Sequence, residues 1–176
     1  YAFVFYPAAK EMSFSGAGEF QPYDVFKDEG KVYDAIKSPA RATFPGRFTI
    51  DYKSSGSEKA FPTRAHFILD GEGEIVKGET MTGWNPFLTP VMLVRRHSEA
   101  VAHVLVLGAG EVKTPIQDIK IVPITVAGHP IPLFKGLAVS LKTDKGSFLI
   151  LDCDLPGKKK AAHIETEESL WIGKVK

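Results

Sequence analysis

The chain has 176 residues, 44% of them hydrophobic and 24% charged, which is an ordinary balance for a folded domain and excludes an intrinsically disordered chain. Its 22 basic and 21 acidic residues leave a formal net charge of +1. This excludes a broad electrostatic attraction to nucleic acid or to an anionic membrane surface, and leaves open only a local basic patch. No apolar run approaches the ~20 residues that cross a bilayer, so we predict no membrane span.

The length suits one domain with a sizeable core. Cys153 is the only cysteine, so no disulfide can form within the chain, which suits cytosolic proteins and many exported bacterial proteins alike. The chain begins at Tyr1 and ends at Lys176, and the residues at both ends are typical of strands. We therefore predict that residues 1–176 form a single β-sandwich domain and are a fragment of a larger protein.

The N-terminal part of the chain is predicted to be one short strand followed by a long loop. The strand covers 2–6, and the loop over 8–21 is rich in glycine and serine. Phe14, Phe20 and Tyr23 are the large aromatic residues of this region. We expect them to anchor the loop to the core.

Two strands can be placed with clear periodicity in the next part of the chain. Apolar and polar residues alternate over 47–53 and again over 63–69, which predicts half-exposed strands whose apolar side chains share one face. The other strands predicted in this half are 23–26, 31–36, for which a helix over 32–37 is the alternative, and 74–78.

The centre of the chain is predicted to be a long hairpin over 87–110. Two apolar runs, 91–94 and 101–107, flank a polar tip at 95–99 that carries all of the charge. Such runs, bounded here by a proline and a glycine, are typical of strands that are buried on both faces. We therefore predict that the two runs are antiparallel partners inside a sheet, with another layer covering each face.

More strands follow the central segment. Pro123 interrupts a strand region over 116–126 and indicates an edge position or a bulge there. The clearest hairpin joins 137–142 to 147–153. The remaining predicted elements are a turn at 128–130, an exposed loop tip at 158–160, and short strands at 164–168 and 170–175.

These elements predict the fold class. Roughly a dozen strand candidates follow one another at a spacing of ~8–12 residues, without a convincing long amphipathic helix. We therefore predict an all-β protein, an antiparallel β-sandwich of two packed sheets with little helix. A closed barrel is the alternative.

No stretch contains a self-sufficient catalytic motif, and we assign no catalytic residue, no metal site and no cofactor. The histidines lack the spacing of metal ligands, although His66 and His103 fall on separate strands and could meet across a sheet. Cys153 lies between two aspartates, which argue against a reactive thiolate, so it is predicted to be a buried or half-buried spectator. The five histidines are His66, His97, His103, His129 and His163.

Trp84, Arg95, Arg96 and His97 are the best candidates for a binding site, and their chemistry suits carbohydrate. Sugars bind to aromatic faces and planar polar groups, and arginine holds a uronate carboxylate or a sulfate in bidentate fashion. Successive strand residues point to opposite faces, so at most one of the two arginines lines a sheet face. The alternative, which is the commoner case, is that the arginines are solvated turn residues and Trp84 anchors the core or a loop.

Several stretches of the chain share the pattern of one protein family. They are a strand from Pro90 that ends in Arg-Arg-His, its return over 100–107, Gly-Leu-Ala-Val-Ser-Leu at 136–141, Gly-Ser-Phe-Leu-Ile-Leu-Asp at 146–152 and the final Trp-Ile-Gly at 171–173. Over 47–176 the chain resembles the C-terminal β-domain of heparinase II/III-type polysaccharide lyases. The resemblance implies a β-sandwich packed against an α/α toroid, secretion to a bacterial periplasm or surface, and elimination chemistry on uronic-acid glycans.

The resemblance also bears on function. The family's catalytic Asn, Tyr and His groups lie mostly on the toroid and on earlier strands, and none can be placed on a matching motif here. We therefore expect a non-catalytic domain of a polysaccharide lyase-like protein that supports or lines a carbohydrate site and is secreted or periplasmic. Its expected partners are an acidic polysaccharide and the toroid of the same parent chain. The alternatives are a stand-alone carbohydrate-binding or structural β-sandwich module without an enzymatic partner, and a small complete β-fold enzyme.

Overall fold

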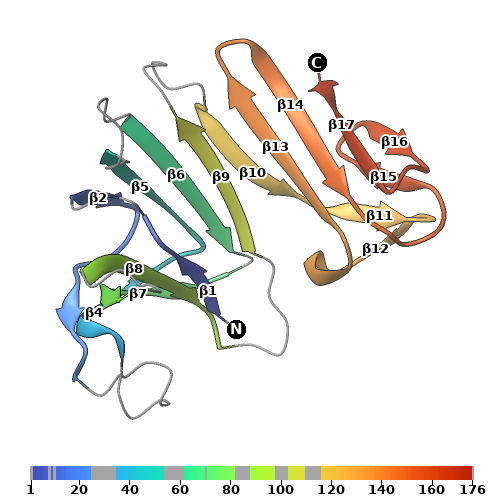
Figure 1. The fold of residues 1–176 in the computed structure, drawn as a ribbon. Coiled ribbons are helices and arrows are strands. Elements are labelled where there is room, and N and C mark those ends of the chain that lie inside the picture. The colour runs from blue at the N-terminus through green and yellow to red at the C-terminus, as the bar shows by residue number, and fades with distance from the viewer. Residues whose placement is uncertain are drawn as a thin grey trace. The chain divides into compact units, whose positions relative to one another are not determined.

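The computed structural model describes residues 2–7, 9, 11–24, 35–53, 62–69, 71–81, 88–97, 103–109 and 116–175. No α-helix occurs among them, and every pair of neighbouring strands is antiparallel (Figure 1). A short 3-10 turn is present at Leu133–Lys135. The predicted all-β antiparallel fold with little helix is confirmed. Within the described chain, no helix has the length and apolar character needed to cross a bilayer.

The chain divides into two compact units. Unit 1 contains residues 1–99 and 103–111, and unit 2 contains 100–102 and 112–176. Each unit has two of the four sheets. Strand periodicity predicts one sandwich over 1–176 and does not reveal this division, because a strand pattern reports that a face is buried but not which sheet covers it.

The described residues of unit 1 form nine strands in two sheets. In chain order they are β1 (Ala2–Phe5), β2 (Met12–Ser15), β3 (Gln21–Pro22), β4 (Lys37–Phe44), β5 (Arg47–Lys53), β6 (Pro62–Leu69), β7 (Gly73–Met81), β8 (Leu88–Arg95) and β9 (His103–Ala109). Sheet A has the order β1-β8-β7-β4-β3, and sheet B has the order β2-β5-β6-β9. The strands predicted over 47–53 and 63–69 are confirmed as β5 and β6. Most of the predicted strands 23–26 and 31–36 falls outside the described residues.

Aromatic side chains join sheets A and B. Phe44 at the end of β4 lies 4.6 Å from Phe48 of β5 between ring centroids, and Phe48 stacks on Phe67 of β6 at 4.7 Å. Phe3 and Phe5 of β1 pack edge-to-face on the Phe67 ring at 6.3 and 5.4 Å. Because side chains alternate along a strand, these rings occupy one face of each sheet. Sheets A and B therefore pack face to face as a β-sandwich.

The predicted central hairpin is wrong in its pairing. The run 91–94 is buried as expected, but it lies in β8, which pairs with β7 and β1 in sheet A. The described part of the second run lies in β9, which pairs with β6 in sheet B, where Val104 lies opposite Ile68. The chain therefore crosses between sheets after β8. Two apolar runs around a polar tip fit a hairpin and a crossover equally well, because the pattern carries no information on the partner strand.

The predicted loop over 8–21 contains regular structure. Strand β2 lies within it and pairs with β5, where Phe14 is opposite Ile50. The Phe14 ring lies 4.7 Å from that of Phe20, and the Nζ atom of Lys77 lies 4.1 Å from the centre of the Phe20 ring. The polar composition of this segment reflects an edge strand with one exposed face.

Unit 2 contains the other strands, again in two sheets. They are β10 (Asp118–Val122), β11 (Ile124–Val126), β12 (His129–Pro130), β13 (Leu137–Thr143), β14 (Gly146–Asp152), β15 (Lys159–Ala161), β16 (Ile164–Thr166) and β17 (Leu170–Val175). Sheet C has the order β10-β13-β14-β17, and sheet D has the order β12-β11-β15-β16. The predicted hairpin of β13 and β14 is confirmed, and Pro123 stands where the chain leaves sheet C for sheet D. The predicted buried position of Cys153 is also confirmed, at 2% exposure.

The predicted exposed tip at 158–160 is wrong at its central residue. Lys159 begins β15 and is 1% exposed, whereas the lysines on either side are exposed. Its Nζ atom donates to the carbonyl oxygens of Gly157 at 3.2 Å and Glu167 at 2.9 Å. Strand alternation turns the middle lysine inward, and its ammonium group ties two loop carbonyls together.

Candidate functional site

The structure places the predicted site residues in different environments. Trp84 lies outside the described residues. Arg95 is the last residue of β8 and is 5% exposed. Arg96 follows the strand, and its guanidinium lies against the backbone of Gly71, where an added Cβ would be 3.0 Å from an Arg96 nitrogen. The His97 side chain is 86% exposed. Only Arg95 of the two arginines therefore lies within a sheet, because β8 ends before Arg96.

Arg95 lies on the outer face of sheet A, the face that is turned away from sheet B. Its neighbour Val94 points to the other side, toward the sandwich interior. The outer face carries its own buried apolar group, which consists of Tyr23, Ile36, Val76, Val91 and Leu93. A backbone hydrogen bond of 2.9 Å from the Tyr23 N–H to the Pro39 carbonyl ties the tyrosine to the sheet.

A buried ion pair forms the centre of the site. Glu74 of β7 lies directly opposite Arg95 in the strand pairing, and the two charged groups approach to 2.5 Å between Glu74 Oε1 and Arg95 Nε. Both atoms are shielded from solvent, and the contact is one of charge, since it lacks the alignment of a hydrogen bond. Another Arg95 nitrogen donates a hydrogen bond of 3.0 Å to the Tyr23 hydroxyl. The pair thus fixes the ring position of Tyr23 over the outer face.

Two further basic side chains, those of Arg41 and His97, lie near the same carboxylate at the surface. Arg41 of β4 stacks over the Tyr23 ring, with its guanidinium carbon 4.5 Å from the ring centroid. One of its nitrogens lies 3.6 Å from Glu74 Oε2, and its side chain is 47% exposed. His97 Nε2 lies 3.4 Å from Glu74 Oε1. We refer to Tyr23, Arg41, Glu74, Arg95 and His97 as the Tyr23 cluster.

The described residues of the Tyr23 cluster include two arginines and one carboxylate, that of Glu74. An aromatic ring and a half-exposed guanidinium on the surface of a sheet are suited to an anionic ligand with an apolar ring face.

Sequence reasoning identified Arg95 and His97 but missed Glu74 and Arg41. Both missed residues lie on strands distant in sequence from Arg95, and they meet it only because β7 pairs with β8 and with β4. Tyr23 was expected only as an anchor of a loop. Its position two residues after an exposed glutamine in a polar segment gave no sign of a binding role.

The outer face of sheet B carries a different polar group. Arg64 donates two hydrogen bonds to Asp51, of 2.6 and 2.8 Å, across the pairing of β6 with β5. The bonded Arg64 lowers the pKa of the Asp51 carboxyl despite the opposing effect of burial. Burial lowers the pKa of nearby His66, and the positive charge of Arg64 lowers it further. This pair is charge-balanced, so it offers no excess charge to a ligand.

The lowered pKa of His66 makes stability dependent on pH. The folded pKa lies below the unfolded value of 6.5, so the neutral side chain contributes stability that is present above 6.5 and is lost as pH falls through the folded pKa. We expect urea unfolding to show lower stability at about pH 5.5 than at about pH 7.5, and His66→Gln to remove part of that difference. His163→Gln, at an exposed position, is the control. An identical pH profile for wild type and His66→Gln would contradict the assignment.

The histidines do not assemble a metal site in the part of the chain that the structure describes. No group of three His, Cys, Asp or Glu residues there has the geometry to hold an ion. His66 and His103, which the sequence allowed to meet across a sheet, are not opposite each other in the strand pairing, because His66 is opposite Val106 and His103 is opposite Leu69.

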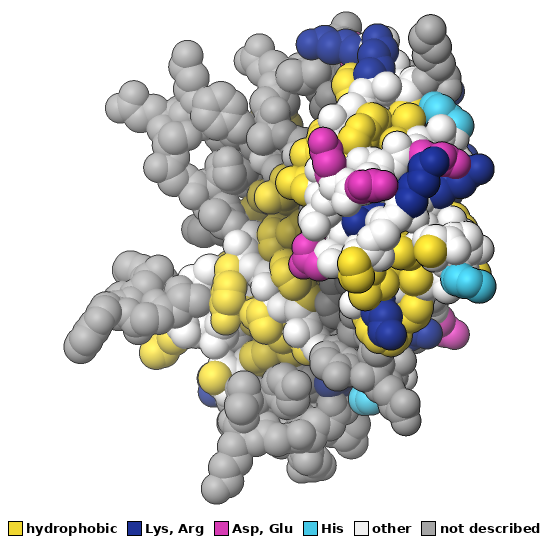
Figure 2. Space-filling model, turned by 90° about the vertical axis from the view of Figure 1, so that its right-hand side faces the viewer, with side chains coloured by type: hydrophobic (Ala, Val, Ile, Leu, Met, Phe, Trp, Pro, Cys, Tyr) yellow, Lys and Arg dark blue, Asp and Glu magenta, His cyan; other side chains and the backbone are white. Residues whose placement is uncertain are grey.

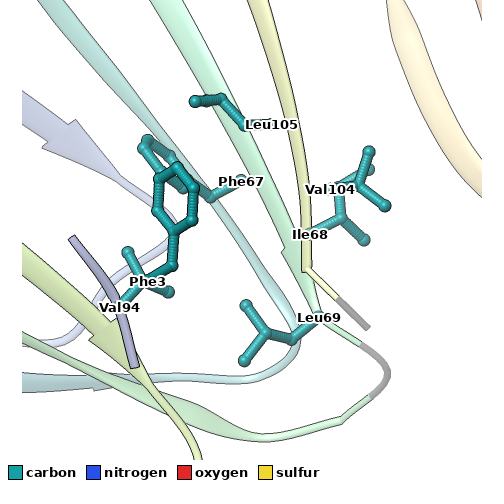
Figure 3. A pocket seen from close by; sticks show the side chains of 7 residues that line it. All are labelled: Phe3, Phe67, Ile68, Leu69, Val94, Val104 and Leu105. Atoms are coloured by element: carbon teal, nitrogen blue, oxygen red, sulfur yellow. The ribbon is translucent and has the colours of Figure 1, made fainter. Parts of the chain in front are cut away.

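A small cavity lies inside the sandwich of unit 1. Its volume is about 20 Å³, and Figure 3 shows its lining, with the Phe3 and Phe67 side chains approaching each other from the two sheets. The lining residues are Phe3, Phe67, Ile68, Leu69, Val94, Val104 and Leu105. The space accommodates about one water molecule and is apolar, so it is a packing defect and not a ligand site.

The surface charge is mixed. Figure 2 shows the side of the molecule at the right of Figure 1, where basic, acidic and hydrophobic side chains are interspersed. This agrees with the net charge of +1. The described side chains of that face form no extended positive field of the kind that binds nucleic acid.

Comparison with known proteins gives no relative from which to transfer a function. The chain matches no family model and no curated protein, and its fold matches no solved structure.

Proposed function

We propose that this chain is a non-catalytic β-sandwich domain of a heparinase II/III-like polysaccharide lyase, and that it supports or lines a site for uronic-acid glycans. The stretches that carry the resemblance correspond to strands β8, β9, β13, β14 and β17. In this proposal the partners are an acidic polysaccharide and the α/α toroid of the same parent chain, in a secreted or periplasmic bacterial protein.

The observation that carries the proposal is the Tyr23 cluster. An acidic glycan presents carboxylate or sulfate groups together with sugar rings that pack on aromatic side chains. The cluster offers the half-exposed guanidinium of Arg41 next to a tyrosine ring, which a buried ion pair holds on the outer face of sheet A. Two of the predicted site residues, Arg95 and His97, belong to it.

Calorimetric titration with heparin, alginate and hyaluronan oligosaccharides tests the proposal. We expect weak binding, with a Kd of about 0.1–1 mM, that weakens further between about 20 and 200 mM salt because a partly exposed charge contact is screened. Neutral malto-oligosaccharides are the control. The absorbance of unsaturated uronate should stay flat, since the domain is proposed to be non-catalytic. Absence of binding by the folded wild type would favour the structural-module alternative.

Replacing each of the two neighbouring arginines distinguishes binding at the Tyr23 cluster from binding through general surface charge. Arg95→Ala should reduce binding, because Arg95 holds Tyr23 and offsets the charge of Glu74. Arg96→Ala should leave it nearly unchanged, because Arg96 lies beyond the strand end. Native circular dichroism of each variant is the folding control. Equal loss from both changes would contradict the proposed location.

A further inference from the structure

We infer that Arg41 is the residue of the Tyr23 cluster that contacts the ligand, and that it takes the carboxylate of a uronic-acid saccharide. This rests on the proposed function and adds the contacting residue and the chemical group. The Arg41 side chain is 47% exposed, whereas that of Arg95 is 6% exposed. A saccharide can therefore reach Arg41 directly, while Arg95 is covered by the residues around it.

The N–H donors of Arg41 are held in place, but none of them is used in a hydrogen bond to Glu74. Its guanidinium carbon lies over the Tyr23 ring, 4.5 Å from the ring centroid, which is within the range of a cation–π contact. Its approach to Glu74, at 3.6 Å, is longer than a hydrogen bond. The guanidinium is thus held by the cation–π contact, and its planar N–H groups remain available for the bidentate geometry that a carboxylate prefers.

Arg95 acts through Tyr23 and is a positioning residue. Its hydrogen bond of 3.0 Å holds the Tyr23 hydroxyl, and its ion pair with Glu74 offsets the carboxylate that would otherwise repel an anion next to Arg41. The buried pair therefore positions the Tyr23 ring under Arg41 and offsets the negative charge of Glu74 near it.

Neutral polar groups adjoin Arg41 on the same face. Gln21 of β3 is its direct partner in the strand pairing, so the two side chains share the outer face of sheet A. Thr43 is two residues further along β4 and therefore on the same face, opposite Glu74. Both are exposed. An amide and a hydroxyl beside a guanidinium match a sugar that carries hydroxyl groups next to its carboxylate.

A thermodynamic cycle that combines changes in the protein with a change in the ligand tests the contact between Arg41 and the carboxylate. A hyaluronan hexasaccharide and its carboxyl-reduced counterpart are titrated by calorimetry into wild type, Arg41→Gln, Arg41→Lys and the control Arg47→Gln, which changes an exposed arginine at the start of β5. We expect Arg41→Gln to weaken hyaluronan binding about tenfold, and Arg41→Lys to weaken it by about half as much on a logarithmic scale, since an ammonium group cannot bind in bidentate fashion. Arg47→Gln should have little effect.

The loss of affinity caused by carboxyl reduction of the ligand and the loss caused by Arg41→Gln should not add. If Arg41 holds the carboxylate, carboxyl reduction weakens wild type as much as Arg41→Gln does, and has little further effect on Arg41→Gln. Equal hyaluronan affinity of wild type and Arg41→Gln, or fully additive losses, would overturn the inference and leave the proposed function standing. If wild type does not bind hyaluronan, this inference is overturned. The proposed function fails as well only if heparin and alginate oligosaccharides also do not bind.

Discussion

Replacing Glu74 by glutamine is expected to lower the free energy of unfolding by about 3–5 kcal/mol. The change keeps the shape of the side chain but removes the carboxylate that forms an ion pair with Arg95, whose side chain is 6% exposed. The buried guanidinium would then lose this opposing charge, and the loss of one partner of a buried pair is far more costly than the net contribution of the pair.

Urea denaturation of Glu74→Gln, compared with that of the control variant Glu72→Gln, measures this effect. Glu72 is exposed shortly before β7, so its replacement should change stability by less than about 0.5 kcal/mol. The double variant Glu74→Leu/Arg95→Met should recover most of the loss, because an apolar pair of similar volume removes both buried charges. If Glu74→Gln matched the exposed control, the buried ion pair would not be the centre of the Tyr23 cluster.

Replacing Lys159 by methionine is expected to lower the free energy of unfolding by about 1–3 kcal/mol, because the carbonyl oxygens of Gly157 and Glu167 lose the hydrogen bonds from the buried ammonium group. Methionine keeps most of the apolar side-chain volume, so the loss reports the hydrogen bonds to Gly157 and Glu167. Those bonds tie the residues before β15 to the residues after β16. The destabilisation should therefore be concentrated in unit 2.

Hydrogen exchange of Lys159→Met and of Lys160→Met tests this expectation. Lys160 is the exposed neighbour in the same strand, and its replacement should change stability by less than about 0.5 kcal/mol. Amides of β15 and β16 should exchange faster only in Lys159→Met. Equal protection in both variants would show that the buried ammonium group is not what holds these loops.

Several features of the fold could be predicted from local pattern alone. The alternation in β5 and β6 placed both strands and their apolar faces, because side-chain direction repeats every two residues whatever the partner strand. The turn between β13 and β14 was also local, since glycine and polar residues separate two apolar runs. The alternation could not predict that β8 ends at Arg95, which leaves only one of the two arginines within the sheet.

The sequence by itself therefore determined the all-β class, most strand positions and which residues share a face. Tertiary structure decided which strands meet, and with them the site. Glu74 and Arg95 face each other only because β7 pairs with β8, and the strand predicted as the partner of β8 lies in the other sheet. Lys159 is buried only because β15 turns it inward toward two loop carbonyls. Periodicity encodes the burial of a face, whereas contacts between distant strands depend on the packing of the whole chain.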